Sequence, residues 1–175
     1  MDTVFETTHL IVRKFKPEDA TALYEIHRED AVSKWIPNER YETHAEAENA
    51  IRFFSSCTEQ GRLPYVLAVE LKKDGTLLGD TGANAVEGRE NEVEIGYVIS
   101  GRHRGKGYAT ELVAAMGSFL HSAFGISTLY GRVLKGNAPS ERVLQKNGFA
   151  FLREEADAAD DPYGCGMLVY KKEFI

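Results

Sequence analysis

The sequence predicts one α+β domain, built on a mixed, mostly antiparallel sheet of about seven strands with flanking helices. The chain of 175 residues contains no linker, repeat or low-complexity stretch that would divide it. Two helical patterns come first, then three β-rich runs with no helix between them, and then a helix, a strand, a helix and two strands. A chain of this length buries roughly 70% of its unfolded surface. Residues 1–175 are therefore expected to form a single domain with its own core.

The first third of the chain contains a strand and two helices. Residues 9–15 are β-rich, which predicts the first strand. Residues 17–28 open on Pro followed by two acidic residues, the pattern of a helix start. Thr43 with Glu46 three residues later is a capping-box pattern, which predicts a second helix that ends at about Thr58.

A change of period marks the sheet-forming part of the chain. Three β-rich runs separated by turn residues predict an antiparallel meander over residues 65–71, 77–86 and 92–100. An apolar stripe with helical spacing then runs from Ala109 to Phe124, and Gly125 is its predicted cap. The remaining predicted elements are a strand at 127–134, a short helix at 139–147, and strands at 149–155 and 165–174.

Charge and composition exclude several classes of function. With 21 basic and 27 acidic residues the net charge is −6, which argues against binding to nucleic acids or anionic membranes. Cys57 and Cys165 lie far apart and outside any CxxC motif, and the five His residues show no metal-binding spacing, so neither a disulfide framework nor a metal is expected. No apolar signal segment or membrane span is present in the sequence, and the expected location is cytoplasmic.

Residues 100–110, Ser-Gly-Arg-His-Arg-Gly-Lys-Gly-Tyr-Ala-Thr, join a predicted strand to a predicted helix. A helix N-terminus presents unpaired N–H groups and a positive dipole, and glycines let an anion approach the backbone, so the pattern predicts a phosphate site. A P-loop is excluded because Gly107 stands where the hydroxyl residue belongs. A dinucleotide fingerprint is excluded because its third glycine is replaced by Thr110. The other interpretation is an ordinary turn with solvated basic residues.

Three motifs in order resemble one enzyme family. The run Arg102-His-Arg-Gly105-Lys-Gly107 is similar to the acyl-CoA loop of the GNAT acetyltransferases, Gln/Arg-x-x-Gly-x-Gly/Ala. Glu94-Ile-Gly-Tyr97 before it and residues 137–149 after it extend the resemblance. With the opening at residues 9–20, the chain resembles the RimJ/RimL-type branch, named for ribosomal-protein-alanine N-acetyltransferases, from about residue 8 to 174. The resemblance implies the GNAT acyl-CoA N-acyltransferase fold, with acetyl-CoA as co-substrate and no metal.

The resemblance also implies where acetyl-CoA is held. The amides of residues 104–109 bind the pyrophosphate, and the edge of the strand at 92–100 aligns the pantetheine as if it were another strand. The Asn137 side chain bonds to the pantetheine arm. The residues that it assigns to the co-substrate are Val98, Ile99, Arg102, Arg104, Gly105, Lys106, Gly107, Tyr108, Ala109, Thr110, Asn137 and Ser140.

Glu94 and Ser140 are the candidate catalytic residues. Only ~10% of an α-amine and ~0.04% of a lysine amine is neutral at pH 7, so a carboxylate that accepts the proton helps the attack on a thioester. Glu94 is that base or a plain solvent-facing charge, and Glu92 or water alone are the alternatives. Ser140 is the donor to the leaving thiolate, although helix capping explains both Ser140 and Asn137. Many family members have a Tyr acid where this chain has Leu144, which leaves a dedicated acid open.

The resemblance implies direct transfer in a ternary complex to a primary amine. A protein N-terminal α-amine is the first expectation, a polyamine, amino acid or antibiotic is the second, and a non-catalytic CoA-binding module is the third. Trp35 is either part of the acceptor wall or a hydrophobic anchor. The five carboxylates between residues 154 and 161 either form a solvated loop or attract a cationic acceptor. The family habit of pairing edge strands makes a homodimer a further expectation.

Overall fold

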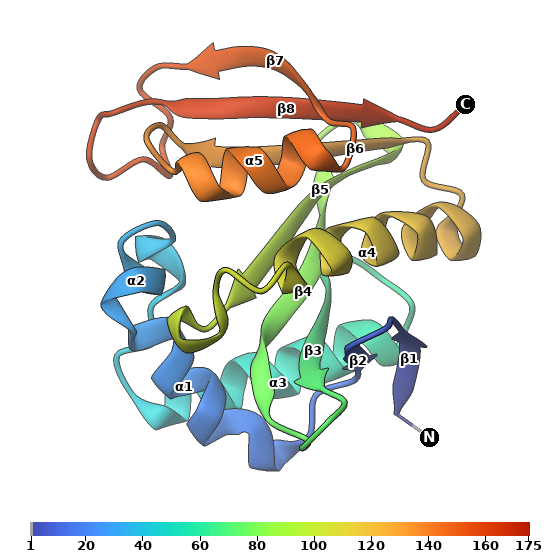
Figure 1. Cartoon of the computed structure of the whole chain (residues 1–175), viewed down its shortest axis with the longest axis vertical. Helices are drawn as coiled ribbons and strands as arrows, with labels where there is room; N and C mark the ends of the chain where they lie inside the picture. Colours follow the sequence, from blue (N-terminus) through green and yellow to red (C-terminus); the bar gives the residue numbers. More distant parts are fainter. Residues whose placement is uncertain (1) are drawn as a thin grey trace.

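The computed structural model describes residues 2–175, and its strands form one mixed sheet of eight (Figure 1). The order across the sheet is β1-β2-β3-β4-β5-β6-β8-β7, and every neighbouring pair is antiparallel except β5 and β6. The strands are β1 (Thr3–Glu6), β2 (Leu10–Arg13), β3 (Tyr65–Leu71), β4 (Leu77–Val86), β5 (Arg89–Ile99), β6 (Thr128–Leu134), β7 (Ala150–Glu155) and β8 (Met167–Glu173).

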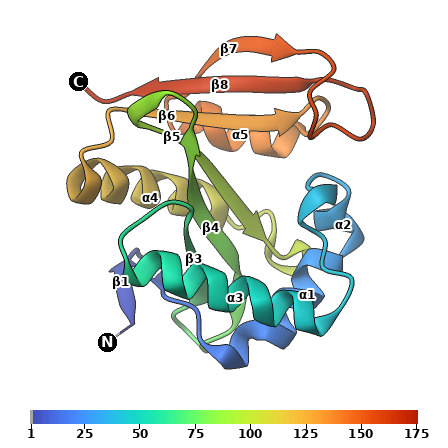
Figure 2. The same ribbon diagram turned by 180° about the vertical axis from the view of Figure 1, so that it is seen from behind.

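Helices cover both faces of this sheet. They are α1 (Ala20–Arg28), α2 (Asp30–Ser33), α3 (His44–Glu59), α4 (Tyr108–Phe124) and α5 (Ala138–Lys146), with short 3₁₀ turns at Pro17–Asp19, Pro37–Glu39 and Gly101–His103. Figures 1 and 2 show α4 and α5 on one face and α1 and α3 on the other. Because β4 is covered on both sides, it is buried without interruption over residues 78–83 instead of alternating.

The main core lies between α4 and the centre of the sheet. Val113, Met116 and Leu120 follow one another at helical spacing and are buried against Val93 of β5 and Leu129 of β6. The helix ends at Gly125, whose φ of +66° suits a residue without a side chain. This core fixes α4, and with it the loop before α4, against β5.

The sheet opens at its centre, between the two parallel strands. Strands β5 and β6 are paired only at Glu92–Thr128, Val93–Leu129 and Glu94–Tyr130. Beyond Glu94, β5 continues to Ile99 with β4 as its partner. Among residues 2–175, no strand pairs with the β6-facing edge of residues 96–99, and its backbone groups are available to an extended ligand.

The α+β class and the mixed, mostly antiparallel sheet are confirmed, with eight strands where about seven were expected. The prediction missed β1, which has only four residues. This strand is held by its pairing with β2 and by the Lys14 N–H, which donates to the Asp2 carbonyl at 2.8 Å. It also missed α2, a single turn.

The predicted capping box at Thr43 is formed only in part. Thr43 does accept the N–H of Glu46 at 3.2 Å, but the Glu46 carboxylate accepts the N–H of Glu42 rather than that of Thr43. Within residues 2–175, no helix has the length and apolar character needed to cross a membrane.

Candidate active site

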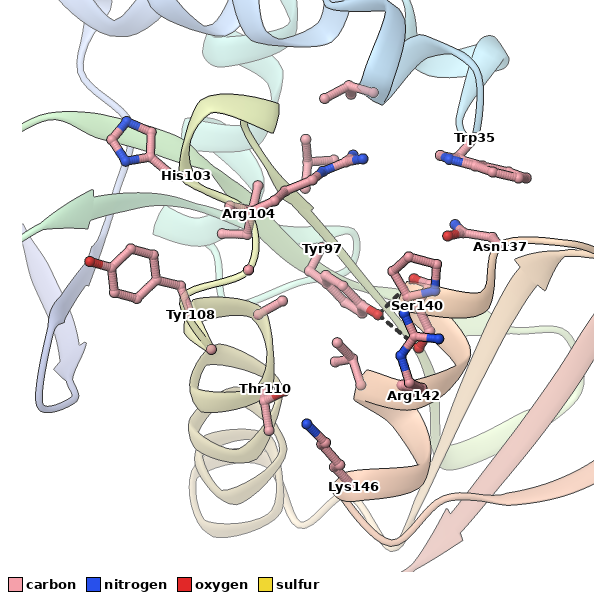
Figure 3. Close-up of a pocket in the computed structure, with 18 of the residues that line it drawn as sticks. Trp35, Tyr97, His103, Arg104, Tyr108, Thr110, Asn137, Ser140, Arg142 and Lys146 are labelled. Carbon is pink, nitrogen blue, oxygen red and sulfur yellow. Dashed lines mark hydrogen bonds between the residues drawn. The ribbon is translucent and has the colours of Figure 1, made fainter.

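A pocket of about 310 Å³ lies beside the free edge of β5 (Figure 3). Its walls come from β5, the loop before α4, the first turn of α4, α5 and the segment around α2. Ten of the twelve residues assigned to the co-substrate line it: Val98, Ile99, Arg104, Gly105, Gly107, Tyr108, Ala109, Thr110, Asn137 and Ser140. Arg102 and Lys106 belong to the same loop but do not line the pocket.

The loop before α4 presents a row of free backbone donors. Gly105 and Gly107 adopt φ angles of +75° and +82°, in the left-handed region that glycine enters without strain. From Gly105 to Thr110, no backbone N–H has an acceptor among residues 2–175. The N–H of Arg104 donates to the Gly101 carbonyl at 3.5 Å, so the free amides begin one residue later than expected. Such a row at a helix N-terminus suits a phosphate group.

The position of this loop is set from the end of α1. The Glu29 carboxylate accepts the Ser100 hydroxyl at 2.7 Å and the Gly101 N–H at 2.6 Å. The Arg104 guanidinium donates to the Ala31 carbonyl at 2.7 Å. Sequence reasoning missed Glu29, because about seventy positions separate it from the loop and no local pattern connects them.

Tyr97 and Ser140 join the free strand to α5. The Tyr97 hydroxyl lies 2.8 Å from the Ser140 hydroxyl, where either group can be the donor, and 3.3 Å from the Ser140 carbonyl oxygen, to which it can also donate. Burial raises the pKa of Tyr97 to about 12, which makes it a poor net proton donor at neutral pH. Asn137 makes no side-chain cap at the start of α5, so capping does not explain this residue.

Leu144 and Tyr170 both face away from the pocket. Leu144 is 1% exposed and packs on Gly131, where an added Cβ would lie 2.8 Å from both Leu144 methyl groups. The buried Tyr170 hydroxyl donates to the Glu141 carboxylate at 2.6 Å. The hydroxyl groups on the β5–α5 side of the pocket therefore come from Tyr97 and Ser140.

Glu94 and Glu92 have different surroundings. Glu94 does not line the pocket; it is half-buried on β5 at the last residue paired with β6, and its side chain has no hydrogen bond within residues 2–175. Burial raises the pKa of Glu94, although Arg132 opposes this change. Glu92 accepts the Tyr130 hydroxyl at 2.7 Å and is 3.4 Å from Arg89. Of the two, Glu94 is the carboxylate that is free to accept a proton.

The acidic segment after β7 is largely engaged in ion pairs. Arg132 binds Glu155 at 2.7 Å and Asp160 at 2.5 Å, and Lys135 binds Glu154 at 2.9 Å. These three carboxylates neutralise local cations, so a structural role accounts for them. Cys57 is buried and Cys165 exposed, and among residues 2–175 no cluster of three or more His, Cys, Asp or Glu could hold a metal ion.

Trp35 was singled out from the sequence, whereas two basic pocket residues were not. Trp35 lines the pocket near Asn137, with the Lys34 ammonium 4.7 Å from the centre of a Trp35 ring, which favours its interpretation as a wall. Arg142 and Lys146 on α5 were missed, although their spacing of four residues places them on one face of a helix.

Comparison with known proteins identifies the family. The family model described as an acetyltransferase (GNAT) domain matches residues 9–150. The uncharacterized N-acetyltransferase YoaA of Bacillus subtilis is 30% identical over 149 residues, which are 85% of this chain and 84% of YoaA.

Solved structures share the fold at lower identity. The ribosomal-protein-S5-alanine acetyltransferase of Vibrio fischeri has a TM-score of 0.83 at 18% identity, covering 97% of this chain and 95% of that one. RimL, a ribosomal L7/L12 α-N-protein acetyltransferase in complex with coenzyme A, has a TM-score of 0.82 at 16% identity, covering 98% of both chains. The expected resemblance and the GNAT fold are confirmed, and the chain belongs to the GNAT family of acetyltransferases.

Proposed function

We propose that this protein transfers an acetyl group from acetyl-CoA to a primary amine, with a protein N-terminal α-amine as the acceptor class. One observation carries the proposal: the loop that presents the free amides of residues 105–110 and the free edge of β5 border the same pocket. The first group suits a pyrophosphate, and the second suits an extended amide chain such as pantetheine. Acetyl-CoA contains both, joined directly to each other in one molecule.

Glu94 is the proposed base. It lies where β5 and β6 separate, so an amine that approaches on that face meets the thioester beside the strand edge. The amine nitrogen attacks the thioester carbonyl, its proton passes to the Glu94 carboxylate directly or through water, and the carbon–sulfur bond breaks. The raised pKa of Glu94 brings it closer to that of the amine, which favours this transfer.

Ser140 is the proposed donor to the leaving thiolate. Ser140 lines the pocket on α5, and when the Tyr97 hydroxyl donates to the Ser140 hydroxyl oxygen, the Ser140 proton is free to point to the thiolate. A thiol with a pKa of about 8.5 leaves readily as thiolate, so a hydrogen bond from Ser140 is sufficient and the proton comes from solvent. This division of roles fits the orientation of Leu144, which is buried against the sheet and faces away from the pocket.

The acceptor class is supported by two of the solved relatives, which are acetyltransferases of ribosomal proteins. Release of free CoA should be measured with N-terminal peptides, polyamines, amino acids and aminoglycosides as acceptors. We expect peptides to give the highest kcat/KM. A faster reaction with a small amine would reassign the acceptor, and silence across the panel with acetyl-CoA bound would identify a non-catalytic CoA-binding module.

The role of Glu94 is tested with Glu94→Gln. We expect kcat/KM to fall about 10²- to 10⁴-fold, the usual contribution of a general base, and the limb of the pH profile that belongs to Glu94 to disappear. Glu92→Gln is the matched control, since Glu92 is already bonded to Tyr130 and should keep most of the activity. An unchanged pH profile in Glu94→Gln would remove this residue as the base.

A single-domain organisation, a cytoplasmic location and a homodimer belong to the same proposal. For the dimer, β7 is an edge strand and is exposed along most of its length, with Phe151 57% and Leu152 44% exposed. Sedimentation across a range of protein concentrations measures this association, and a constant monomer mass would exclude it.

A further inference from the structure

Two basic residues on α5 face the pocket and lack an acidic partner. Arg142 and Lys146 are four positions apart, and both line the pocket on the side that faces α4 (Figure 3). Neither forms an ion pair within residues 2–175, although the chain has 27 acidic residues and a net charge of −6. An unpaired arginine and lysine beside one cavity, in an acidic protein, indicate an anionic ligand.

Glu141, the acidic residue of α5, does not neutralise Arg142 or Lys146. Glu141 accepts the Tyr170 hydroxyl at 2.6 Å, toward the sheet. The end of α5 is also fixed: the Asn147 side-chain amide donates to the Thr110 carbonyl in the first turn of α4 at 3.2 Å. Lys146, which precedes Asn147, is therefore held near Thr110 in the first turn of α4, without being part of the loop before that helix.

The chemistry of CoA identifies the anion. The free amides of residues 105–110 already account for the pyrophosphate, and the pantetheine arm and the adenine base carry no charge at neutral pH. The remaining charge is the 3′-phosphate on the ribose, a monoester with about −1.5 to −2 at pH 7. On the basis of the proposed function, we infer that Arg142 and Lys146 bind the 3′-phosphate and make the pocket select CoA over 3′-dephospho-CoA.

Calorimetric titration of the full-length chain with CoA and with 3′-dephospho-CoA tests this inference. We expect the wild-type Kd to be about 10- to 30-fold lower for CoA, the sum of two exposed contacts to a phosphate. The double variant Arg142→Gln/Lys146→Gln should bind both ligands equally, with the wild-type Kd for 3′-dephospho-CoA. The control Arg52→Gln/Lys73→Gln removes the same two residue types from exposed positions outside the pocket and should keep the preference.

Three results would overturn the inference. Equal wild-type affinities would show that the 3′-phosphate is not recognised. An equal loss for both ligands in the α5 double variant would assign these cations to the pyrophosphate instead. If the wild-type protein binds neither ligand, the proposed function itself fails, and that outcome is visible before any variant is compared. The single variants Arg142→Gln and Lys146→Gln apportion the preference between the two side chains.

Discussion

Removing the Glu29 carboxylate should loosen the phosphate loop from a distance. Glu29 accepts the buried Ser100 hydroxyl at 2.7 Å and the Gly101 N–H at 2.6 Å, and each hydrogen bond to a charged group contributes about 1.5–3 kcal/mol. Two bonds at the lower value give roughly 3 kcal/mol, equivalent to about a 100-fold change in a dissociation constant. Because part of this energy appears as lost stability, we expect Glu29→Ala to raise the Kd for CoA about 10- to 100-fold.

The assay is calorimetric titration with CoA, together with a thermal melt of each variant. Glu29→Gln keeps one acceptor oxygen but loses the charge, so its effect should be intermediate. Glu25→Ala is the matched control, since Glu25 is exposed on the same helix and has no hydrogen bond or ion pair within residues 2–175. Wild-type CoA affinity in Glu29→Ala, with a change in Tm no larger than that of Glu25→Ala, would refute the role of Glu29.

Two further predictions concern stability. His27 is buried between the Asp80 carboxylate at 2.7 Å and the Glu39 carbonyl at 2.8 Å. Both partners are acceptors, so the ring is held as imidazolium. Burial lowers the pKa of His27, but the charge of Asp80 outweighs burial and raises this pKa overall. The contribution of His27 to stability is therefore complete below about pH 6.5 and is lost as pH rises through the folded pKa. The urea midpoint of the wild type should decrease as the pH is raised from 6 to 9, and that of His27→Gln should decrease less. An equal decrease in the two proteins would contradict this. Gly79→Ala would place a Cβ 1.9 Å from the Val98 carbonyl oxygen and should destabilise the fold by about 2 kcal/mol or more, measured by urea unfolding. Gly96→Ala, with open space around its Cβ, is the control that should unfold like wild type.

The sequence predicts those parts of the fold whose determinants are local. The helix at α4 follows from its apolar spacing and Gly125, and the strands β3 to β5 follow from their turn residues. The strand β1 has four residues and depends on pairing with β2, so its own pattern was too short to indicate it. Local sequence signals therefore predict the long elements but not the short ones, which depend on pairing with a neighbouring strand or packing against a neighbouring element.

The same distinction applies to the candidate site. The free amides of the loop before α4 follow from Gly105 and Gly107, whose spacing is legible in the sequence. The supports of that loop are not: Glu29 reaches it from α1, and Tyr97 reaches Ser140 from β5, each through a contact formed only when the sheet is assembled. Gly79 gives no local signal either, because its constraint is the carbonyl of Val98 on the neighbouring strand.

The early end of the β5–β6 pairing has a mechanical consequence. Within residues 2–175, the strand pairing between the ladder β1–β5 and the ladder β6–β8 is limited to three residue pairs, so the sheet has a seam. A pantetheine chain bonded to the free edge of β5, with α5 on its other side, would act as a tie across that seam. Backbone amides of residues 96–99 should then exchange with solvent more slowly when CoA is bound, and the two ladders should unfold together at a higher temperature. In this arrangement the co-substrate also completes the structure that binds it.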